Sequence, residues 1–229
     1  MQTTRRQALQ LISVFPLMSK SARAENAQEF PIQADDGAPV QNFRIPSELD
    51  PAILPGIVWN GRKSADVIFY EFFDYNCAFC RKAAREIEAI RAKDSDLRFG
   101  LINNAILSIG SIQAAKVQQA ILKLRGPHVA YDFHVRMFAT HGQSNGASAL
   151  SIARDLGLDV RKVEETADSS VVTDVLSRQT QLAANLGMSM TPSFVIAGIG
   201  ILGWPGVKAL QSIIANARKC DHPVCDDKN

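Results

Sequence analysis

The chain of 229 residues has no phosphate-binding loop, no dinucleotide-binding fingerprint and no serine nucleophile elbow. We therefore expect no nucleotide cofactor. Its formal charge of +2 gives no reason to expect a nucleic acid or an acidic membrane as partner. His128, His134 and His141 lack the i, i+4 spacing of a helical metal pair, so we expect no metal. Hydrophobic residues make up 46% of the chain, which is enough for a core without metal or disulfide support.

The N-terminus carries four basic residues and no acid in its first 24 positions. Arg5-Arg6 precede a short apolar stretch, too short for a bilayer span, and the segment closes on the small-residue pattern Ala22-Arg23-Ala24. This order predicts an export signal over 1–24, by the twin-arginine or the Sec route, with cleavage after Ala24. The alternative is a basic N-terminal helix of a cytosolic protein. Export would place the mature chain in the periplasm, an oxidising compartment where disulfides persist.

The next part of the chain predicts a strand–helix–strand unit. Residues 25–64 contain several prolines that interrupt any long helix, so we expect an irregular N-terminal arm with a short helix near Pro51. The apolar, aromatic stretch 65–73 predicts a buried strand, 78–93 an amphipathic helix and 97–102 a second strand. This order is typical of a βαβ unit with a parallel pair.

From about residue 110 to residue 186 the apolar periodicity is helical throughout. The expected helices span 111–125, 130–142, 146–158, 159–169 and 171–187. The glycines near residue 198 then predict a hairpin of 191–198 with 199–204, followed by a last helix over 205–219 that starts at Pro205. The predicted fold class is α/β, with the order β-α-β, helical insert, β-β-α.

Cys77 and Cys80 form a C-x-x-C motif where the first strand meets its helix. Inside a βαβ unit this position is typical of a thioredoxin-like redox motif. Unpaired backbone N–H groups at a helix N-terminus favour the thiolate of the first cysteine, so we expect Cys77 to have a pKa of about 5–7 and to be the nucleophile. Cys80, one turn further on, would resolve the mixed disulfide. Two alternatives are a zinc site shared with Cys220 and Cys225, and an inert structural disulfide.

The stretch "YEFFDYNCAFCRKA", the helical insertion and the later "GMSMTPSFVIAG" together resemble the DsbA-like thioredoxin-fold oxidoreductases of the bacterial cell envelope. The resemblance covers about residues 65–218. It implies that Pro192 is a cis proline facing the two cysteines, and that the backbone of Thr191 pairs with an extended substrate. It also implies a buried acid at Glu71, with a raised pKa, that relays a proton from Cys80. The alternatives are a trans Pro192 and a solvent-facing Glu71.

The chain departs from the resemblance in two places. Ala78-Phe79 stands between the cysteines, where the best-known oxidant of the family has Pro-His, so no imidazole is present there to stabilise the thiolate. The arm 25–64 is too short and too rich in proline to be the dimerisation domain of envelope disulfide isomerases. We therefore expect an oxidase rather than a reductase or isomerase, and a monomer.

Cys220 and Cys225 lie in the tail "KCDHPVCDDKN" beyond the last predicted helix. Pro223 favours a turn between them, and we expect a local, structural disulfide worth at most about 2 kcal/mol. The alternative is a second redox pair that exchanges with Cys77–Cys80.

Together these observations predict four segments. They are an export signal at 1–24, an arm at 25–64, a thioredoxin-like domain at 65–218 with a helical insertion at about 104–187, and a tail at 219–229. The predicted function is thiol–disulfide exchange that donates a disulfide to cysteines of secreted proteins, with a membrane redox partner that reoxidises or reduces Cys77–Cys80. A reductase or isomerase, or a redox-inactive thioredoxin-fold binding or surface protein, are the alternatives.

Overall fold

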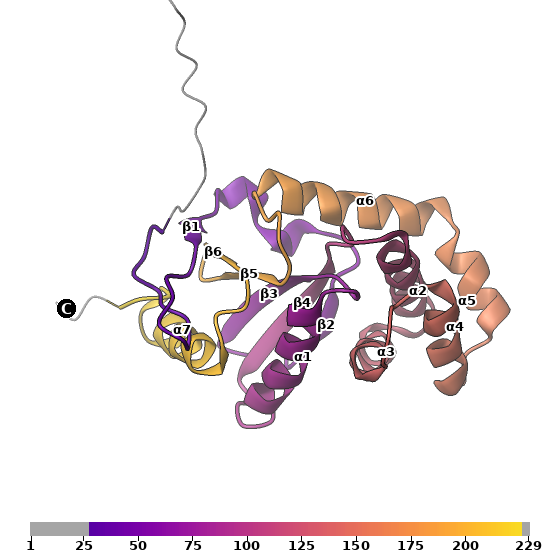
Figure 1. Ribbon diagram of the computed structural model, residues 1–229, viewed down its shortest axis with the longest axis horizontal. Coiled ribbons are helices and arrows are strands. Elements are labelled where there is room, and N and C mark those ends of the chain that lie inside the picture. The colour runs from indigo at the N-terminus through magenta and orange to yellow at the C-terminus, as the bar shows by residue number, and fades with distance from the viewer. Residues whose placement is uncertain (1–27, 226–229) are drawn as a thin grey trace, which may run out of the picture.

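A computed structural model describes residues 28–225 (Figure 1). The predicted export signal, residues 1–24, lies outside the described residues, as do positions 226–229 of the tail. Within the described part, no helix is both long and apolar enough to cross a membrane.

A six-stranded mixed sheet forms the centre of the molecule. Its strands are β1 (Asn42–Arg44), β2 (Val58–Asn60), β3 (Val67–Phe73), β4 (Leu97–Asn103), β5 (Ser193–Ile196) and β6 (Ile199–Leu202), in the spatial order β1-β6-β5-β3-β4-β2. β3 and β4 are parallel, as the strand–helix–strand order predicted, and the remaining pairs are antiparallel. The α/β fold class is confirmed.

Seven helices surround or extend this sheet in the described residues. They are α1 (Ala78–Arg91), α2 (Ile109–Arg125), α3 (Pro127–Ala139), α4 (Gly146–Asp155), α5 (Val160–Ala167), α6 (Ser170–Asn185) and α7 (Val207–Cys220). The five predicted helices of the insertion correspond to α2–α6, which lie between β4 and β5 in sequence and form a block beside and above the sheet in Figure 1. The apolar periodicity therefore identified every helix of the insertion.

The prediction that Pro205 begins the last helix was wrong by two residues. α7 begins at Val207, and Gly206, with a φ of +100°, is its N-cap. The Asp35 carboxylate accepts hydrogen bonds from the backbone N–H groups of Lys208 and Ala209, and it lies where a Cβ on Gly206 would be. A distant acid thus sets the start of this helix, which local sequence does not reveal.

The prediction of an irregular arm over 25–64 missed two short strands. β1 pairs with β6 and β2 pairs with β4, so the arm supplies both edges of the sheet. The short helix expected near Pro51 is a 3₁₀ turn over Pro51–Ile53. The Phe43 ring packs directly over Gly200, where a Cβ would clash, which allows β1 to lie against β6. Three-residue edge strands have too few positions for alternation to be visible in the sequence.

The two faces of the sheet have separate hydrophobic cores. Phe69 and Phe73 of β3 pack in one core with residues of α1, α3 and α7, including Ile87 and Ile213. Phe72 of β3 packs in the other core with the C-terminal part of α6. Because side chains alternate along β3, Glu71 shares the face of Phe69 and Phe73, and it therefore points into the larger core.

Candidate active site

The cysteine pair lies where β3 ends and α1 begins. Cys77 is the N-cap of α1, and its sulfur accepts a hydrogen bond from the backbone N–H of Cys80 at 3.2 Å. The Cys77 thiol donates to the backbone carbonyl of Thr191 at 3.0 Å. Both cysteines are free thiols and both are buried, Cys80 completely.

The two thiols differ strongly in acidity. A hydrogen bond from the Cys80 side chain, with further hydrogen bonds from the Thr191 side chain and from the backbone N–H groups of the helix start, lowers the pKa of Cys77 to about 6 against the opposing effect of burial. Burial raises the pKa of Cys80 far above the usual range, and its bond to Cys77 and the charge of Glu71 add to the rise. At neutral pH Cys77 is therefore a thiolate and Cys80 a thiol.

Glu71 lies beneath the cysteines in the larger core. It is buried, and its Oε1 has no hydrogen-bond partner among the described residues. Its strand neighbours Leu101 and Phe194 are apolar, which explains why burial, with the charge of Cys77 second, raises the pKa of Glu71 to about 8. The carboxyl group thus holds its proton at neutral pH and sits close enough to Cys77 and Cys80 to influence both.

Thr191 and Pro192 face the cysteines from the loop before β5. The Thr191–Pro192 peptide bond is cis, and the contact of the Thr191 carbonyl with the Cys77 sulfur joins the two segments. The structure therefore brings together five of the residues singled out from the sequence, namely Cys77, Cys80, Glu71, Thr191 and Pro192.

Two polar residues that sequence reasoning did not single out hold the cysteine turn in place. The buried Asp74 carboxylate accepts from the backbone N–H groups of Asn76, Ile106 and Leu107 and from the hydroxyl of Ser111. Asn76 donates to the Ser144 carbonyl and accepts from its N–H. The hydrogen bond that the Asn76 N–H donates to the Asp74 carboxylate forms an Asx turn. The stretch "DYNC" contains the aspartate that favours such a turn, so the sequence could have indicated it.

A second buried pair lies next to the site. The Tyr75 hydroxyl and Nδ1 of His134 are 3.5 Å apart, and the imidazole is enclosed by the rings of Phe73 and Phe138. Burial lowers the pKa of His134 to about 3, so the ring is neutral. His134 is therefore a neutral residue of the core beside the site.

Exposed apolar side chains surround the cysteine pair. Phe79, between the two cysteines, is 65% exposed, and Met190, next to Thr191, is 43% exposed. Ile106 and Leu107 follow β4 in the loop that Asp74 holds, and both are exposed. Apolar groups gathered in this way commonly mark a surface that contacts another polypeptide.

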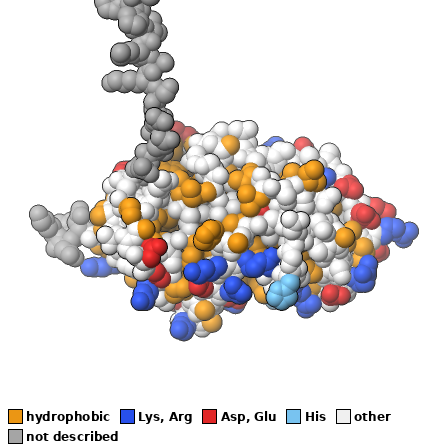
Figure 2. All heavy atoms as spheres, in the orientation of Figure 1, with side chains coloured by type: hydrophobic (Ala, Val, Ile, Leu, Met, Phe, Trp, Pro, Cys, Tyr) orange, Lys and Arg blue, Asp and Glu red, His pale blue; other side chains and the backbone are white. Residues whose placement is uncertain are grey.

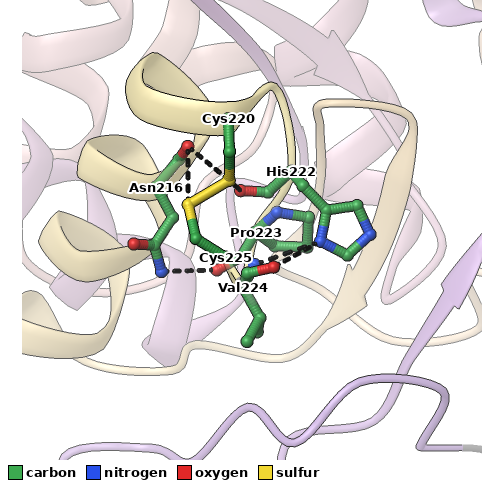
Figure 3. Close-up of a disulfide and its surroundings, with 6 residues drawn as sticks. All are labelled: Asn216, Cys220, His222, Pro223, Val224 and Cys225. Carbon is green, nitrogen blue, oxygen red and sulfur yellow. Dashed lines mark hydrogen bonds between the residues drawn. A yellow bond between two sulfur atoms is a disulfide. The ribbon is translucent and has the colours of Figure 1, made fainter. Parts of the chain in front are cut away.

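The tail cysteines lie at the end of α7 (Figure 3), which Figure 1 shows on a different side of the molecule from the start of α1. Cys220 and Cys225 form a disulfide, and Asn216 of α7 donates to the Pro223 carbonyl at 2.9 Å. The ring of His222 packs edge-on against Phe30 of the arm, with centroids 4.4 Å apart. The closed loop therefore connects α7 to the N-terminal arm.

A thioredoxin-type sheet, a cysteine pair at a helix start and a cis proline opposite it define a class of thioredoxin-fold proteins with a paired-cysteine site. The family model described as the DSBA-like thioredoxin domain matches residues 69–215, and the chain belongs to that family. The resemblance seen in the sequence is confirmed.

Solved structures share this fold. A thioredoxin-like oxidoreductase from Silicibacter pomeroyi DSS-3 is 31% identical, with a TM-score of 0.67 over 72% of this chain and 94% of that one. The thiol-disulfide exchange protein alpha-DsbA2 from Wolbachia pipientis is 21% identical (TM-score 0.64; 70% and 86% covered), and BdbD from Bacillus subtilis is 20% identical (TM-score 0.64; 72% and 94% covered).

A curated relative is longer than this chain. The Na(+)/H(+) antiporter NhaA of Herminiimonas arsenicoxydans is 25% identical over 177 residues, which is 76% of this chain and 28% of that protein. The match thus covers less than a third of that relative's length.

Proposed function

We propose that this protein is a thiol–disulfide oxidoreductase of the periplasm that donates the Cys77–Cys80 disulfide to cysteines of secreted proteins. The observation that carries the proposal is the contrast between an acidic Cys77, with a pKa of about 6, and a buried Cys80 that keeps its proton. Cys77 can therefore leave a mixed disulfide as a thiolate, whereas Cys80 takes up a proton when the Cys77–Cys80 bond breaks. Family membership supports the same chemistry.

The exchange has two steps. A substrate thiolate attacks the Cys77 sulfur, the Cys77–Cys80 bond breaks, and Cys80 receives the electron pair and a proton. A second substrate thiolate then attacks the substrate sulfur of the mixed disulfide, and Cys77 leaves as a thiolate. The substrate ends with a new disulfide and the enzyme with two reduced sulfurs. A membrane redox partner would return the enzyme to the disulfide form.

Glu71 is the proposed proton relay for Cys80. The charge of Cys77 helps to keep Glu71 protonated, and that charge is absent while Cys77 is bound in a mixed disulfide. The carboxyl group is then more acidic and can supply the proton that Cys80 needs. Thr191 and Pro192 are the proposed substrate-binding residues, because an extended chain could pair with the Thr191 backbone next to the Cys77 sulfur.

The acidity of Cys77 supports the proposed direction of electron flow. A stabilised thiolate stabilises the reduced enzyme and makes its disulfide a stronger oxidant, which favours donation over reduction. The apolar surface at Phe79 and Met190 supports unfolded secreted polypeptides as substrates. Export through residues 1–24, which would leave a mature chain beginning at Glu25, is part of the same proposal.

The test is the reduction potential of the Cys77–Cys80 pair in glutathione redox buffers, together with oxidation of a peptide that has two cysteines. We expect a potential less negative than about −200 mV and stoichiometric peptide oxidation. A potential near the value of about −270 mV that is typical of thioredoxin would favour the reductase alternative. Failure to oxidise the peptide would favour a redox-inactive binding protein.

We propose a structural role for the tail disulfide. Changing both tail cysteines, Cys220→Ser with Cys225→Ser, should lower the free energy of unfolding by at most about 2 kcal/mol, since the closed loop is short. The rate of peptide oxidation should stay within about twofold of the unchanged protein, because the disulfide lies away from Cys77. A large loss of oxidation rate at unchanged stability would instead make the tail a second redox pair.

A further inference from the structure

The first half of α1, which begins at the cysteine pair, carries unpaired positive charge. Lys82 and Arg85 are exposed, and neither makes a hydrogen bond or an ion pair within residues 28–225. Several arginines elsewhere do have acidic partners: Arg218 pairs with Asp66 and Asp94, and Arg62 with Asp96. The α1 charges are therefore available to an outside partner.

The charges also add to the helix dipole instead of offsetting it. The N-terminus of a helix has a partial positive charge, and acidic side chains are the stabilising choice there. The first turn of α1 has no acid, and Arg81, Lys82 and Arg85 follow it directly. Glu86 is the acid within this stretch, and it is partly buried. The charge pattern thus adds positive potential beside Cys77.

Arg81 helps to fix this surface in place. Its guanidinium donates to the backbone carbonyls of Phe138 and Thr140, which ties α1 to the end of α3. Figure 2 shows Lys and Arg side chains gathered in the middle of the face where α1 lies in Figure 1, with hydrophobic side chains beside them. A basic area with apolar side chains beside it therefore lies on the face that carries α1.

We propose that Lys82 and Arg85 determine substrate specificity by binding carboxylates of the polypeptide segment that flanks the reacting cysteine. At a rise of about 1.5 Å per residue, Lys82 lies about 7 Å and Arg85 about 12 Å along the helix from Cys77. An extended substrate covers these distances in about two to four residues. Substrates with Asp or Glu at those positions react fastest. The inference rests on the proposed thiol exchange at Cys77.

The test compares two small disulfides of opposite charge, oxidised glutathione (anionic) and cystamine (cationic), as oxidants of the reduced protein. Cys77 thiolate attacks either one, its S–S bond breaks and one half leaves as a thiolate. Cys80 then displaces the other half and forms the Cys77–Cys80 bond. The measured quantity is the ratio of the two rate constants, because the fraction of Cys77 present as thiolate cancels from it.

The wild-type protein should prefer the anionic disulfide by about tenfold at low ionic strength, and the preference should shrink as salt screens the charges. Lys82→Glu with Arg85→Glu should lower the ratio at least about tenfold. The matched control is Arg161→Glu with Lys162→Glu on α5, which exchanges two exposed charges at the far end of the insertion and should keep the ratio within about twofold.

A second arm uses two dithiol peptides that differ only in Glu or Lys two to four residues from the cysteine. The oxidised wild-type protein should oxidise the Glu peptide faster, and the Lys82→Glu, Arg85→Glu protein should lose or reverse that preference. An unchanged ratio in the α1 variant, or an equal fall in the α5 control, would overturn the inference while thiol exchange stands. If the reduced protein reacts with neither disulfide, the proposed thiol–disulfide exchange itself is contradicted.

Discussion

Cys80→Ala is expected to accumulate in cells as mixed disulfides with secreted proteins, whereas Cys77→Ala is not. Cys77 is the sulfur that contacts Thr191 and carries the low pKa, so it is the one that bonds to substrate. The Cys80→Ala protein holds no internal disulfide, so its Cys77 thiolate attacks disulfides of secreted proteins, and one sulfur of the partner leaves as a thiolate. Cys80 would break this mixed disulfide by attacking the Cys77 sulfur, so its loss should slow that route of release by at least about 10³-fold and leave only thiols of the partner or of the solution. Non-reducing electrophoresis and mass spectrometry of the trapped species measure the outcome.

The tail supplies the matched control for this trapping experiment. Cys220→Ser with Cys225→Ser removes two sulfurs, against one in Cys80→Ala, but it leaves Cys77 and Cys80 in place, so this variant should trap nothing. Equal trapping by Cys77→Ala and Cys80→Ala would reverse or dissolve the assignment of nucleophile and resolving thiol. Trapping by neither would contradict thiol exchange at this site.

Glu71→Gln is expected to stabilise the oxidised protein by an amount that grows with pH. In the folded protein the pKa of Glu71 is raised to about 8, while in the unfolded chain it is near the ordinary value of 4.5. Between these values the folded state holds a proton that the unfolded state has released, so the free energy of unfolding falls as pH rises. Below about pH 4 the group is neutral in both states and contributes no such loss.

The size of the effect follows from the difference in pKa. Each pH unit between 4.5 and the folded-state pKa of Glu71 costs the folded protein about 1.4 kcal/mol. The pKa of about 8 belongs to the reduced protein, where the charge of Cys77 adds to burial, so in the oxidised protein Glu71→Gln should gain less than about 5 kcal/mol at pH 8 relative to pH 4. The oxidised protein is the right sample, because it carries no Cys77 thiolate. Denaturant titrations at several pH values measure the gain. Glu164→Gln, an exposed acid of α5, is the control and should show no comparable pH dependence.

The same variant separates a proton relay from a merely buried acid. If Glu71 exchanges a proton with Cys80, Glu71→Gln should slow the steps in which Cys80 is protonated or deprotonated by about 10²-fold or more, while the pKa of Cys77 stays low. Stopped-flow measurement of mixed-disulfide decay reports this rate. A stability gain without a change in decay would leave Glu71 outside the mechanism.

The sequence by itself determined the parts that depend on short-range chemistry. The apolar run before Cys77 predicted β3, and periodicity predicted α1 and the five helices of the insertion. The resemblance implied a buried Glu71, and its burial is confirmed, because alternation along β3 puts it on the face of Phe69 and Phe73. The C-x-x-C motif and Thr191-Pro192 supported the family resemblance. Both can be recognised from adjacent residues alone, one at the start of a helix and the other before a strand.

Only the tertiary structure decided the features that join distant segments. The edge strands β1 and β2 form because β6 and β4 provide hydrogen-bonding partners, and Gly200 leaves room for Phe43. Asp35 sets the start of α7 from more than 170 residues away in the sequence. Asp74 and Asn76 hold the cysteine turn through bonds to Ser111 and Ser144. Each of these features depends on hydrogen bonds and contacts between segments that are far apart in the sequence. The residues next to a segment in the sequence do not show which distant segment it will contact.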